Sequence, residues 1–184
     1  MAVRYTTSDD LRRFGAELDD TRRRVIVETA KARSPRFATF LSHSSKDADL
    51  LPGVVLILEN HGATVYLDKK DDSLPPYTSR ETASALRSRV SDSSKFVLLA
   101  SENSKDSRWV PWELGLADGY KRPDNVAVFP SVDKWYDFTW TEHEYLGVYD
   151  RIVWGDHVDY KVKIWMVLNQ EHNTATELRR WLQS

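Results

Sequence analysis

The sequence predicts an α/β fold in which helices flank a parallel sheet. From Arg36 onward, short apolar runs alternate with amphipathic stretches of helical length, which is the pattern of repeated β-α-β units. One run, residues 95–100, is apolar along almost its whole length, as expected for a central strand that is covered on both faces. A length of 184 residues fits a single domain of ordinary size.

Each predicted strand is a short apolar run bounded by polar residues, glycine or proline. The five runs are 37–41, 63–68, 95–100, 125–130 and 149–154. Pro130 is expected to end the fourth strand. Alternating apolar residues from Tyr160 to Leu168 predict one further strand. The aromatic-rich residues 135–140 fit neither a helix nor a strand clearly.

The predicted helices lie between these strands and at the end of the chain. The first ends near Asn60, with Pro52 in its early turns and Gly62 as a left-handed cap. A second helix is predicted to open at the capping box of Thr78 and Glu81. A third runs from about residue 107 to 120, with Pro111 in its first turn. The last is predicted to open at the capping box of Thr174 and Glu177.

The first 35 residues predict an amphipathic helix, opened by a capping box of Thr7 and Asp10. The apolar residues expected on its shared face are Leu11, Phe14, Leu18 and Val25. Such a helix either packs on the flank of the domain or serves self-association or a partner. We therefore expect an N-terminal helical extension over 1–35, a main domain over 36–160, and a strand and helix over 161–184 that complete it.

Composition excludes several classes of function. With 26 Lys and Arg against 28 Asp and Glu, the net charge of −2 gives no general attraction to nucleic acids or anionic membranes. The chain has no cysteine, which excludes thiol catalysis and disulfide scaffolds and suits a reducing compartment. The longest apolar run, 54–58, is far shorter than the roughly 20 residues that span a bilayer. We expect a soluble, cytoplasmic protein with no membrane or nucleic-acid partner.

Polar residues that follow the strands are the candidates for a binding site, because open α/β sheets bind ligands beyond the carboxyl ends of their strands. They are Ser42, His43, Ser44 and Lys46 after the first strand and Asp68 after the second. Hydroxyls, helix amides and a lysine can hold a phosphate, but a plain helix cap fits the turn equally well. No G-x-G-x-x-G or P-loop motif occurs. The five histidines show no triad or metal-ligand spacing, so no metal is expected.

The helix predicted from Ser107 carries a carboxylate on its apolar side. Trp109, Trp112 and Leu116 share a face at helical spacing, and Glu113 lies between them. No basic residue stands one turn away on the same helix, and an unpaired carboxylate among aromatic rings is costly to desolvate. Two interpretations remain open: a pairing with another element or exposure at the helix start, or a catalytic acid in a cleft edged by tryptophan.

Together these segments resemble the Toll/interleukin-1 receptor (TIR) domains of stand-alone bacterial proteins. Residues 37–47 are similar to the first box of the family, a strand that runs into a serine-rich turn. Residues 69–80 correspond to its proline-containing BB loop, and residues 107–114 resemble its S-x-W-x-x-x-E-L signature. The resemblance covers roughly residues 36–130.

The resemblance implies a flavodoxin-like three-layer sandwich with a central parallel five-stranded sheet, plus N-terminal and C-terminal helical extensions. It also implies an enzyme that cleaves the nicotinamide–ribose bond of NAD⁺, giving ADP-ribose or a cyclic or conjugated ADP-ribose signal, as in bacterial anti-phage defence. NAD⁺ is then the substrate, and no cofactor is needed. The site residues implied are Glu113 as the catalytic carboxylate, Trp109 beside the ribose or nicotinamide, Ser42, His43, Ser44 and Lys46 on the nucleotide, and Asp68 at the edge of the cleft.

Two other functions remain open at this point: a non-catalytic adaptor that acts through TIR–TIR contacts, and a host-directed effector that acts by protein interaction. An unpaired acid, Glu113, on the same face as Trp109 and Trp112 favours the enzyme, because an adaptor does not need an acid there. For the enzyme, the resemblance implies homo-oligomers formed by TIR–TIR contacts and a separate effector protein that responds to the product.

Overall fold

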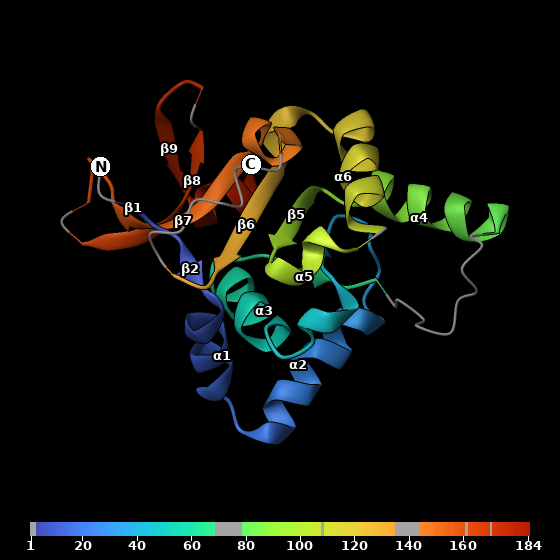
Figure 1. Ribbon diagram of the computed structural model, residues 1–184, viewed down its shortest axis with the longest axis horizontal. Helices are drawn as coiled ribbons and strands as arrows, with labels where there is room; N and C mark the ends of the chain where they lie inside the picture. The colour runs from blue at the N-terminus through green and yellow to red at the C-terminus, as the bar shows by residue number, and fades with distance from the viewer. Residues whose placement is uncertain (1–2, 69–78, 108, 135–143, 161, 170) are drawn as a thin grey trace.

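The structure is a computed structural model of the chain, and it describes every residue except 1–2, 69–78, 108, 135–143, 161 and 170. Over the described residues, nine strands form one sheet that has helices on both faces (Figure 1). The strands are β1 (Val3–Arg4), β2 (Thr6–Thr7), β3 (Thr39–Ser42), β4 (Val65–Tyr66), β5 (Lys95–Ala100), β6 (Val126–Val132), β7 (Asp150–Asp156), β8 (Lys163–Asn169) and β9 (Thr174–Glu177). The α-helices are α1 (Ser8–Ala16), α2 (Asp20–Ala32), α3 (Leu51–Asn60), α4 (Arg80–Asp92), α5 (Glu102–Lys105), α6 (Trp109–Tyr120) and α7 (Leu178–Gln183).

The centre of the sheet is parallel. Strands β4, β3, β5, β6 and β7 lie side by side in that order and all run in the same direction. Numbered along the chain, this is the 2-1-3-4-5 order of flavodoxin-like folds. The predicted five-stranded parallel sheet is confirmed, but the whole sheet is wider. Strands β8 and β9 extend it antiparallel, β1 pairs antiparallel with β7, and β2 pairs parallel with β6.

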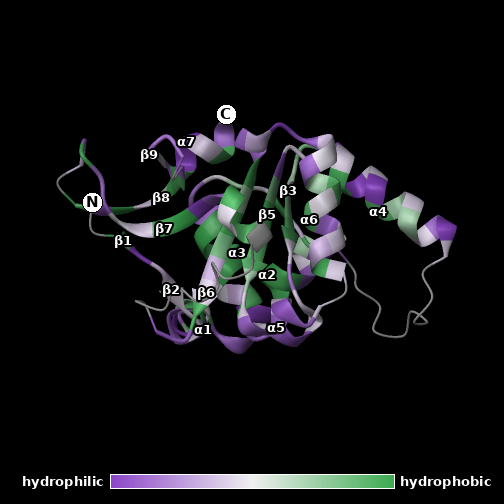
Figure 2. Cartoon of the chain, turned by 45° about the horizontal axis from the view of Figure 1, so that its top comes forward, coloured by the Kyte–Doolittle hydropathy of each residue, from purple (hydrophilic) through white to green (hydrophobic). Residues whose placement is uncertain are grey.

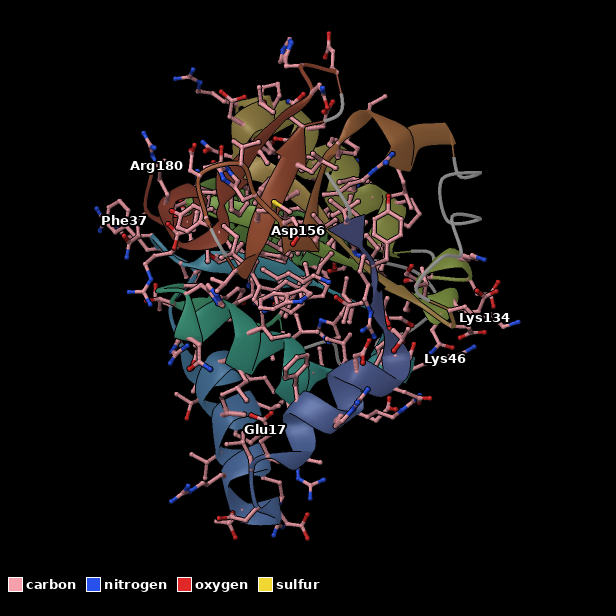
Figure 3. All side chains as sticks on the ribbon, turned by 90° about the vertical axis from the view of Figure 1, so that its left-hand side faces the viewer. Glu17, Phe37, Lys46, Lys134, Asp156 and Arg180 are labelled. Atoms are coloured by element: carbon pink, nitrogen blue, oxygen red, sulfur yellow. The ribbon has the colours of Figure 1, made fainter. Side chains whose placement is uncertain are left out.

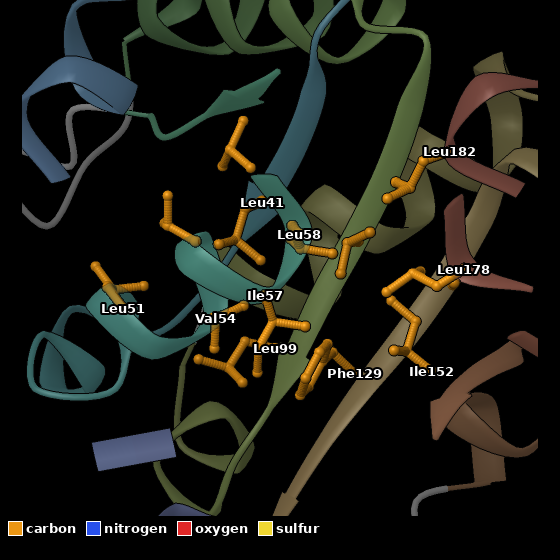
Figure 4. Packing of buried hydrophobic residues seen from close by; sticks show 14 of the residues in the cluster. Leu41, Leu51, Val54, Ile57, Leu58, Leu99, Phe129, Ile152, Leu178 and Leu182 are labelled. Carbon is orange, nitrogen blue, oxygen red and sulfur yellow. The ribbon is translucent and has the colours of Figure 1, made fainter. Parts of the chain in front are cut away.

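Two apolar clusters cover the two faces of the sheet. Because successive strand residues point to opposite faces, Leu41 and Leu99 contribute to one cluster, whereas Phe40 and Leu98 contribute to the other. The first cluster includes residues of α1, α2, α3 and α7, and Figure 4 shows its packing around α3. The second includes residues of α4 and α6. We call the first the α3-side cluster and the second the α6-side cluster. Figure 2 shows the hydrophobic residues concentrated on the central strands and on α3, so the predicted three-layer sandwich is confirmed.

The prediction of a single N-terminal helix is wrong, because the described part of residues 1–35 forms two short strands and two helices. The Thr7–Asp10 capping box is present and opens α1. The Asp19 side chain then caps a second helix by accepting a hydrogen bond from Arg22 N at 2.8 Å, and the turn between the helices carries Glu17 (Figure 3). Both helices pack beside α3, which favours the flanking role over a free partner helix. Val25, predicted on the apolar face, is 58 % exposed because it belongs to the separate α2.

Local signals that depend on backbone geometry are confirmed. Strand β5 has the predicted bounds, Lys95–Ala100, and is buried throughout. Pro52 lies in the first turn of α3, where its missing N–H is harmless. Gly62 follows that helix with a φ of 92°, the left-handed conformation that glycine adopts without strain.

Two predicted boundaries are wrong. Pro130 does not end β6, because Ser131 and Val132 continue the strand by pairing with β2. Residues 174–177 form strand β9 opposite β8, so their capping-box spacing opens no helix, and α7 begins only at residue 178. Helix α4 is capped by the side chain of Ser79, which accepts a hydrogen bond from Thr82 N at 3.2 Å. The proposed cap Thr78 and the aromatic residues 135–140 lie outside the described residues.

Candidate active site

The strand order places a site at the carboxyl ends of β3 and β5. From β3 the chain passes through α3 to β4 on one side and later returns through α4 to β5 on the other side. The two crossovers therefore lie on opposite sides of β3, and flavodoxin-like folds bind ligands at such a switch point. The residues that end β3 and follow β5, together with α6 packed beside these strands, are the ones to examine.

Glu113 is buried at this end of the sheet, with 1 % of its surface exposed. Its Oε2 accepts a hydrogen bond from the hydroxyl of Ser42, the last residue of β3, which is itself fully buried. The apolar neighbours of Glu113 on α6 follow from the helical spacing, since Val110 and Leu114 face the same cluster. The structure thus brings together two of the predicted site residues that lie 71 positions apart in the chain.

Asp68, just beyond the end of β4, belongs to a second polar group beside Glu113. Its Oδ1 accepts a hydrogen bond from the Tyr66 hydroxyl at 2.9 Å and one from Arg89 Nη1 at 2.5 Å. Burial, followed by the charge of Asp68 and the hydrogen bond to it, raises the pKa of Tyr66; the nearby Glu113 carboxylate raises it further. The phenol therefore stays protonated and donates to Asp68 across the physiological pH range.

The serine-rich turn after β3 is only partly available to a ligand. His43 is 6 % exposed, and its Nδ1 lies 3.2 Å from the carbonyl oxygen of Leu41. Ser44 is also buried, and its side chain caps the short 3₁₀ helix Ser45–Asp47 by accepting from Lys46 N at 3.4 Å. Lys46 is exposed and lies at the surface on the same side as Lys134 (Figure 3). The cap interpretation of this turn is confirmed, and Lys46 is its solvent-facing cation.

Asp47 ties this turn to the loop after β5, and the sequence did not single it out. The residue is fully buried. Its carboxylate accepts hydrogen bonds from Ser101 Oγ at 2.6 Å and from Asn103 Nδ2 at 2.7 Å. Ser101 also caps α5, the short helix that precedes α6. The sequence did hold a signal for this contact. The acidic Asp47 follows β3, the polar Ser101 and Asn103 follow β5, and both loops come at the carboxyl ends of neighbouring strands.

The predicted tryptophan pair edges the amino-terminal turn of α6. The rings of Trp109 and Trp112 lie 5.6 Å apart at 60°, and both side chains are half-buried against the α6-side cluster. The guanidinium of Arg87 on α4 lies 5.7 Å from the centre of the Trp112 ring, a cation–π arrangement. Tyr66, Arg87 and Arg89 were not predicted, because nothing in their local spacing relates β4 and α4 to Glu113.

A sequence profile described as the TIR domain matches residues 39–159, which is well over half of the chain. The chain belongs to the TIR domain family. The profile spans β3 to β7, so it includes both the Ser42–Glu113 contact and the Asp68 group.

This TIR domain is also similar to a curated protein named "Probable 3′ cyclic ADP-D-ribose synthase ThsB′" from Bacillus cereus (strain MSX-D12). The two sequences are 36 % identical over 147 residues, which cover 78 % of this chain and 74 % of the relative. The similarity therefore extends beyond the motifs and includes most of both chains.

Two further findings concern metal ions and membranes. Within the part of the chain that the structure describes, no three His, Cys, Asp or Glu side chains gather closely enough to bind a metal ion. Within the same residues, no helix has the length and apolar character needed to cross a membrane.

Proposed function

We propose that this TIR domain protein is an enzyme that cleaves the nicotinamide–ribose bond of NAD⁺ and forms a cyclic ADP-ribose signal in bacterial anti-phage defence. One observation carries the proposal: the buried Glu113 carboxylate, bonded to Ser42 at the switch point of the sheet, in a chain that is 36 % identical to a probable 3′ cyclic ADP-D-ribose synthase. NAD⁺ is the substrate, and the mechanism requires no cofactor or metal.

A single carboxylate suits this reaction. Ordinary glycosidases use two acids, because an alkoxide leaving group has to be protonated while positive charge develops on the sugar. The nicotinamide of NAD⁺ is already cationic and leaves as a neutral molecule, so no general acid is needed. One negative group beneath the ribose then stabilises the oxocarbenium-like transition state, and a buried position increases its effect. We assign this role to Glu113.

The fate of the ADP-ribosyl cation determines the product. The C1′–N bond breaks with both electrons leaving on nicotinamide. A nucleophilic group of the same ADP-ribosyl unit then bonds to C1′ and releases a proton, which yields a cyclic product. Water in its place yields linear ADP-ribose and a proton, and another acceptor yields a conjugate. The similarity to a probable cyclic ADP-D-ribose synthase supports the first route.

The other predicted residues receive roles that agree with their positions. Ser42 is a positioning residue, because its hydroxyl holds Glu113 and is fully buried. Trp109, half-buried at the start of α6, is proposed to pack beside the ribose or nicotinamide. Lys46 is proposed to meet the phosphates from the surface, with His43 and Ser44 shaping the turn behind it. Asp68, held by Tyr66 and Arg89, is proposed to border the cleft.

The burial of Glu113 also bears on regulation. A carboxylate with 1 % exposure reaches a ribose only after neighbouring groups move, so we propose that the structure represents a resting enzyme. Assembly into homo-oligomers through TIR–TIR contacts is proposed to complete the site, and the product is proposed to activate a separate effector protein. A cytoplasmic location belongs to the same proposal, because NAD⁺ is abundant there and the chain has no cysteine.

The test is to incubate the protein with NAD⁺ at high concentration and under crowding, and to separate the products by chromatography with mass detection. Glu113→Gln keeps the size of the side chain and removes its charge, so turnover should fall by about 10²-fold or more. Glu102→Gln is the matched control, because Glu102 is an exposed acid on the neighbouring α5 that pairs with Lys105; it should retain full turnover.

The same experiment separates the alternatives. Nicotinamide with a cyclic product supports the proposed reaction, and linear ADP-ribose alone identifies a glycohydrolase. Equal turnover by wild type and Glu113→Gln removes Glu113 from its catalytic role. NAD⁺ that stays intact in assembled, crowded protein contradicts the enzyme and favours the adaptor.

A further inference from the structure

A cavity of about 210 Å³ lies between the N-terminal segment and the antiparallel part of the sheet. Its walls come from the residues of β1, β2 and α1 on one side and of β7 and β8 on the other. Its lining residues are Arg4, Tyr5, Thr6, Asp10, Phe14, Trp154 and Trp165. None of them belongs to the Ser42–Glu113 contact, the Asp68 group or the Trp109–Trp112 pair. The cavity is therefore separate from the candidate active site.

The inner wall of the cavity is aromatic. Trp165 is 7 % exposed and lies at the centre of the group. The Trp154 ring is 5.5 Å from it at 57°, and the Phe14 ring is 6.3 Å from it at 62°. Tilted rings of this kind present both faces and edges to a guest, which suits a flat π system that stacks on one ring and meets the edge of another.

The charges that line the cavity compensate each other. Arg4 and Asp10 form an ion pair in its wall. Burial works to raise the pKa of Asp10, but the hydrogen bonds with Thr7 and the charge and hydrogen bond of Arg4 together lower it, so the pair stays ionised at neutral pH. A guest in this cavity meets no net charge from its lining, which favours a neutral molecule over an ion.

The volume of the cavity and one unpaired hydroxyl in its wall indicate which kind of neutral molecule it would bind. An apolar cavity of about 150 Å³ accommodates benzene, so about 210 Å³ suits two fused rings. Thr6 lines the cavity, is 3 % exposed, and its Oγ1 has no hydrogen-bond partner among the described residues. A guest with a hydrogen-bonding edge would supply the partner that this hydroxyl lacks among the described residues, which favours such a guest over a plain hydrocarbon.

We propose that this cavity binds a neutral, fused-ring heteroaromatic molecule that has a hydrogen-bonding edge, the chemistry of a purine base. The rings of Trp154 and Trp165 supply the stacking surface, and the Thr6 hydroxyl supplies the hydrogen bond that distinguishes such a ligand from a plain hydrocarbon. Because the walls come from both the N-terminal segment and β7–β8, an occupied cavity holds these two parts of the chain together.

Adenine is the probe, and indole is a bicyclic comparison that has a different polar edge. Titration of ¹⁵N-labelled full-length protein follows the indole N–H signals of the seven tryptophans, assigned through single Trp→Phe variants. Adenine should move the Trp154 and Trp165 signals saturably, with a Kd of about 1 mM or lower. Signals of Trp109 and Trp112 should stay in place.

Substitution tests the hydrogen bond. Thr6→Val keeps the shape and removes a hydroxyl that has no partner among the described residues, so the melting temperature should not fall, while adenine should bind about tenfold more weakly and indole equally well. Thr176→Val, in the lining of a different cavity, is the matched control and should leave both ligands unaffected. Trp154→Leu removes part of the stacking wall and should weaken both.

Three results would overturn the proposal. One is an adenine titration that never saturates. The second is a saturable shift confined to Trp109 and Trp112, which would assign adenine to the candidate active site. The third is a Thr6→Val protein that binds adenine as tightly as wild type. None of these results depends on NAD⁺ turnover, so the cavity and the proposed reaction can fail separately.

Discussion

The hydrogen bonds that Asp47 accepts from Ser101 and Asn103 join the loop after β3 to the loop that leads into α6. Asp47→Asn turns an amide donor toward the Asn103 amide, and Asn103→Asp turns a carboxylate toward the Asp47 carboxylate. Each single change should lower the free energy of unfolding by about 1–3 kcal/mol, because a buried polar group loses its partner. Urea unfolding followed by circular dichroism measures this loss.

The double variant Asp47→Asn with Asn103→Asp is the control for this pair. It exchanges donor and acceptor between the two positions, so most of the lost stability should return, and turnover of NAD⁺ should return with it. Additive losses in the double variant would show that the 2.7 Å contact between Asp47 and Asn103 contributes little to holding the loops together.

Residue-scale features could be predicted from sequence where one helix or one turn contains the whole signal. The orientation of Glu113 toward the apolar side of α6 follows from its spacing to Trp109 and Trp112, and the structure buries it. The Ser42 hydroxyl bonded to Glu113, and the group of Tyr66, Asp68 and Arg89, depend on contacts between distant segments. No local pattern relates such residues, so their pairing appears only in the fold.

At the scale of elements, the close approach of α1 to α3 depends on Gly53. A Cβ atom built on Gly53 would lie 2.1 Å from the carbonyl oxygen of Leu11, which is backbone and has little freedom to move. Gly53→Ala should therefore force the helices apart and lower the free energy of unfolding by about 3 kcal/mol. Thermal or urea unfolding of the purified variant measures the change.

Gly119→Ala on α6 is the matched control. A Cβ atom there meets no atom of the described residues within 4 Å, so alanine should raise the free energy of unfolding by about 0.5–1 kcal/mol through its better helix propensity. If both variants were destabilised equally, the contact with Leu11 would not be the cause at Gly53.

Elements were predictable where burial is extreme, and they were missed where two patterns compete. The run of β5, apolar except for Lys95, is typical of a central strand, and its bounds agree with the structure. Residues 174–177 match a capping box, but pairing with β8 decides their conformation, and that partner lies too far away for a local pattern to reveal. The break between α1 and α2 has a local cause, the Asp19 cap, which the continuous charge pattern of the segment concealed.

At the scale of the whole molecule, the candidate site draws on segments that only the complete parallel sheet brings together. Ser42 ends β3, Asp68 follows β4, the loop after β5 holds Asp47, and α6 carries Glu113. The order of the strands was implied by family resemblance, whereas the added strands β1, β2, β8 and β9 were not. They matter because they attach both ends of the chain to the central sheet.

Removal of residues 1–35 tests whether the N-terminal segment is an accessory extension, as the predicted division at residue 36 implies, or part of the core. The segment buries Leu11 and Ala30 completely, and Arg33 donates a hydrogen bond to the Val65 carbonyl at 3.1 Å. Strands β1 and β2 also pair with β7 and β6. We expect the shortened chain to lose cooperative unfolding and to bind a hydrophobic dye, because the apolar surface of α3 becomes exposed.

Addition of a synthetic peptide with the sequence of residues 1–35 provides the control. If the segment is part of the core, the peptide should restore cooperative unfolding and suppress dye binding, since it covers the same surface of α3. A shortened chain that unfolds cooperatively at the temperature of the full chain would contradict this expectation and identify residues 1–35 as an extension. The shortened chain also lacks one wall of the aromatic cavity, so even if its fold persists it should not bind adenine.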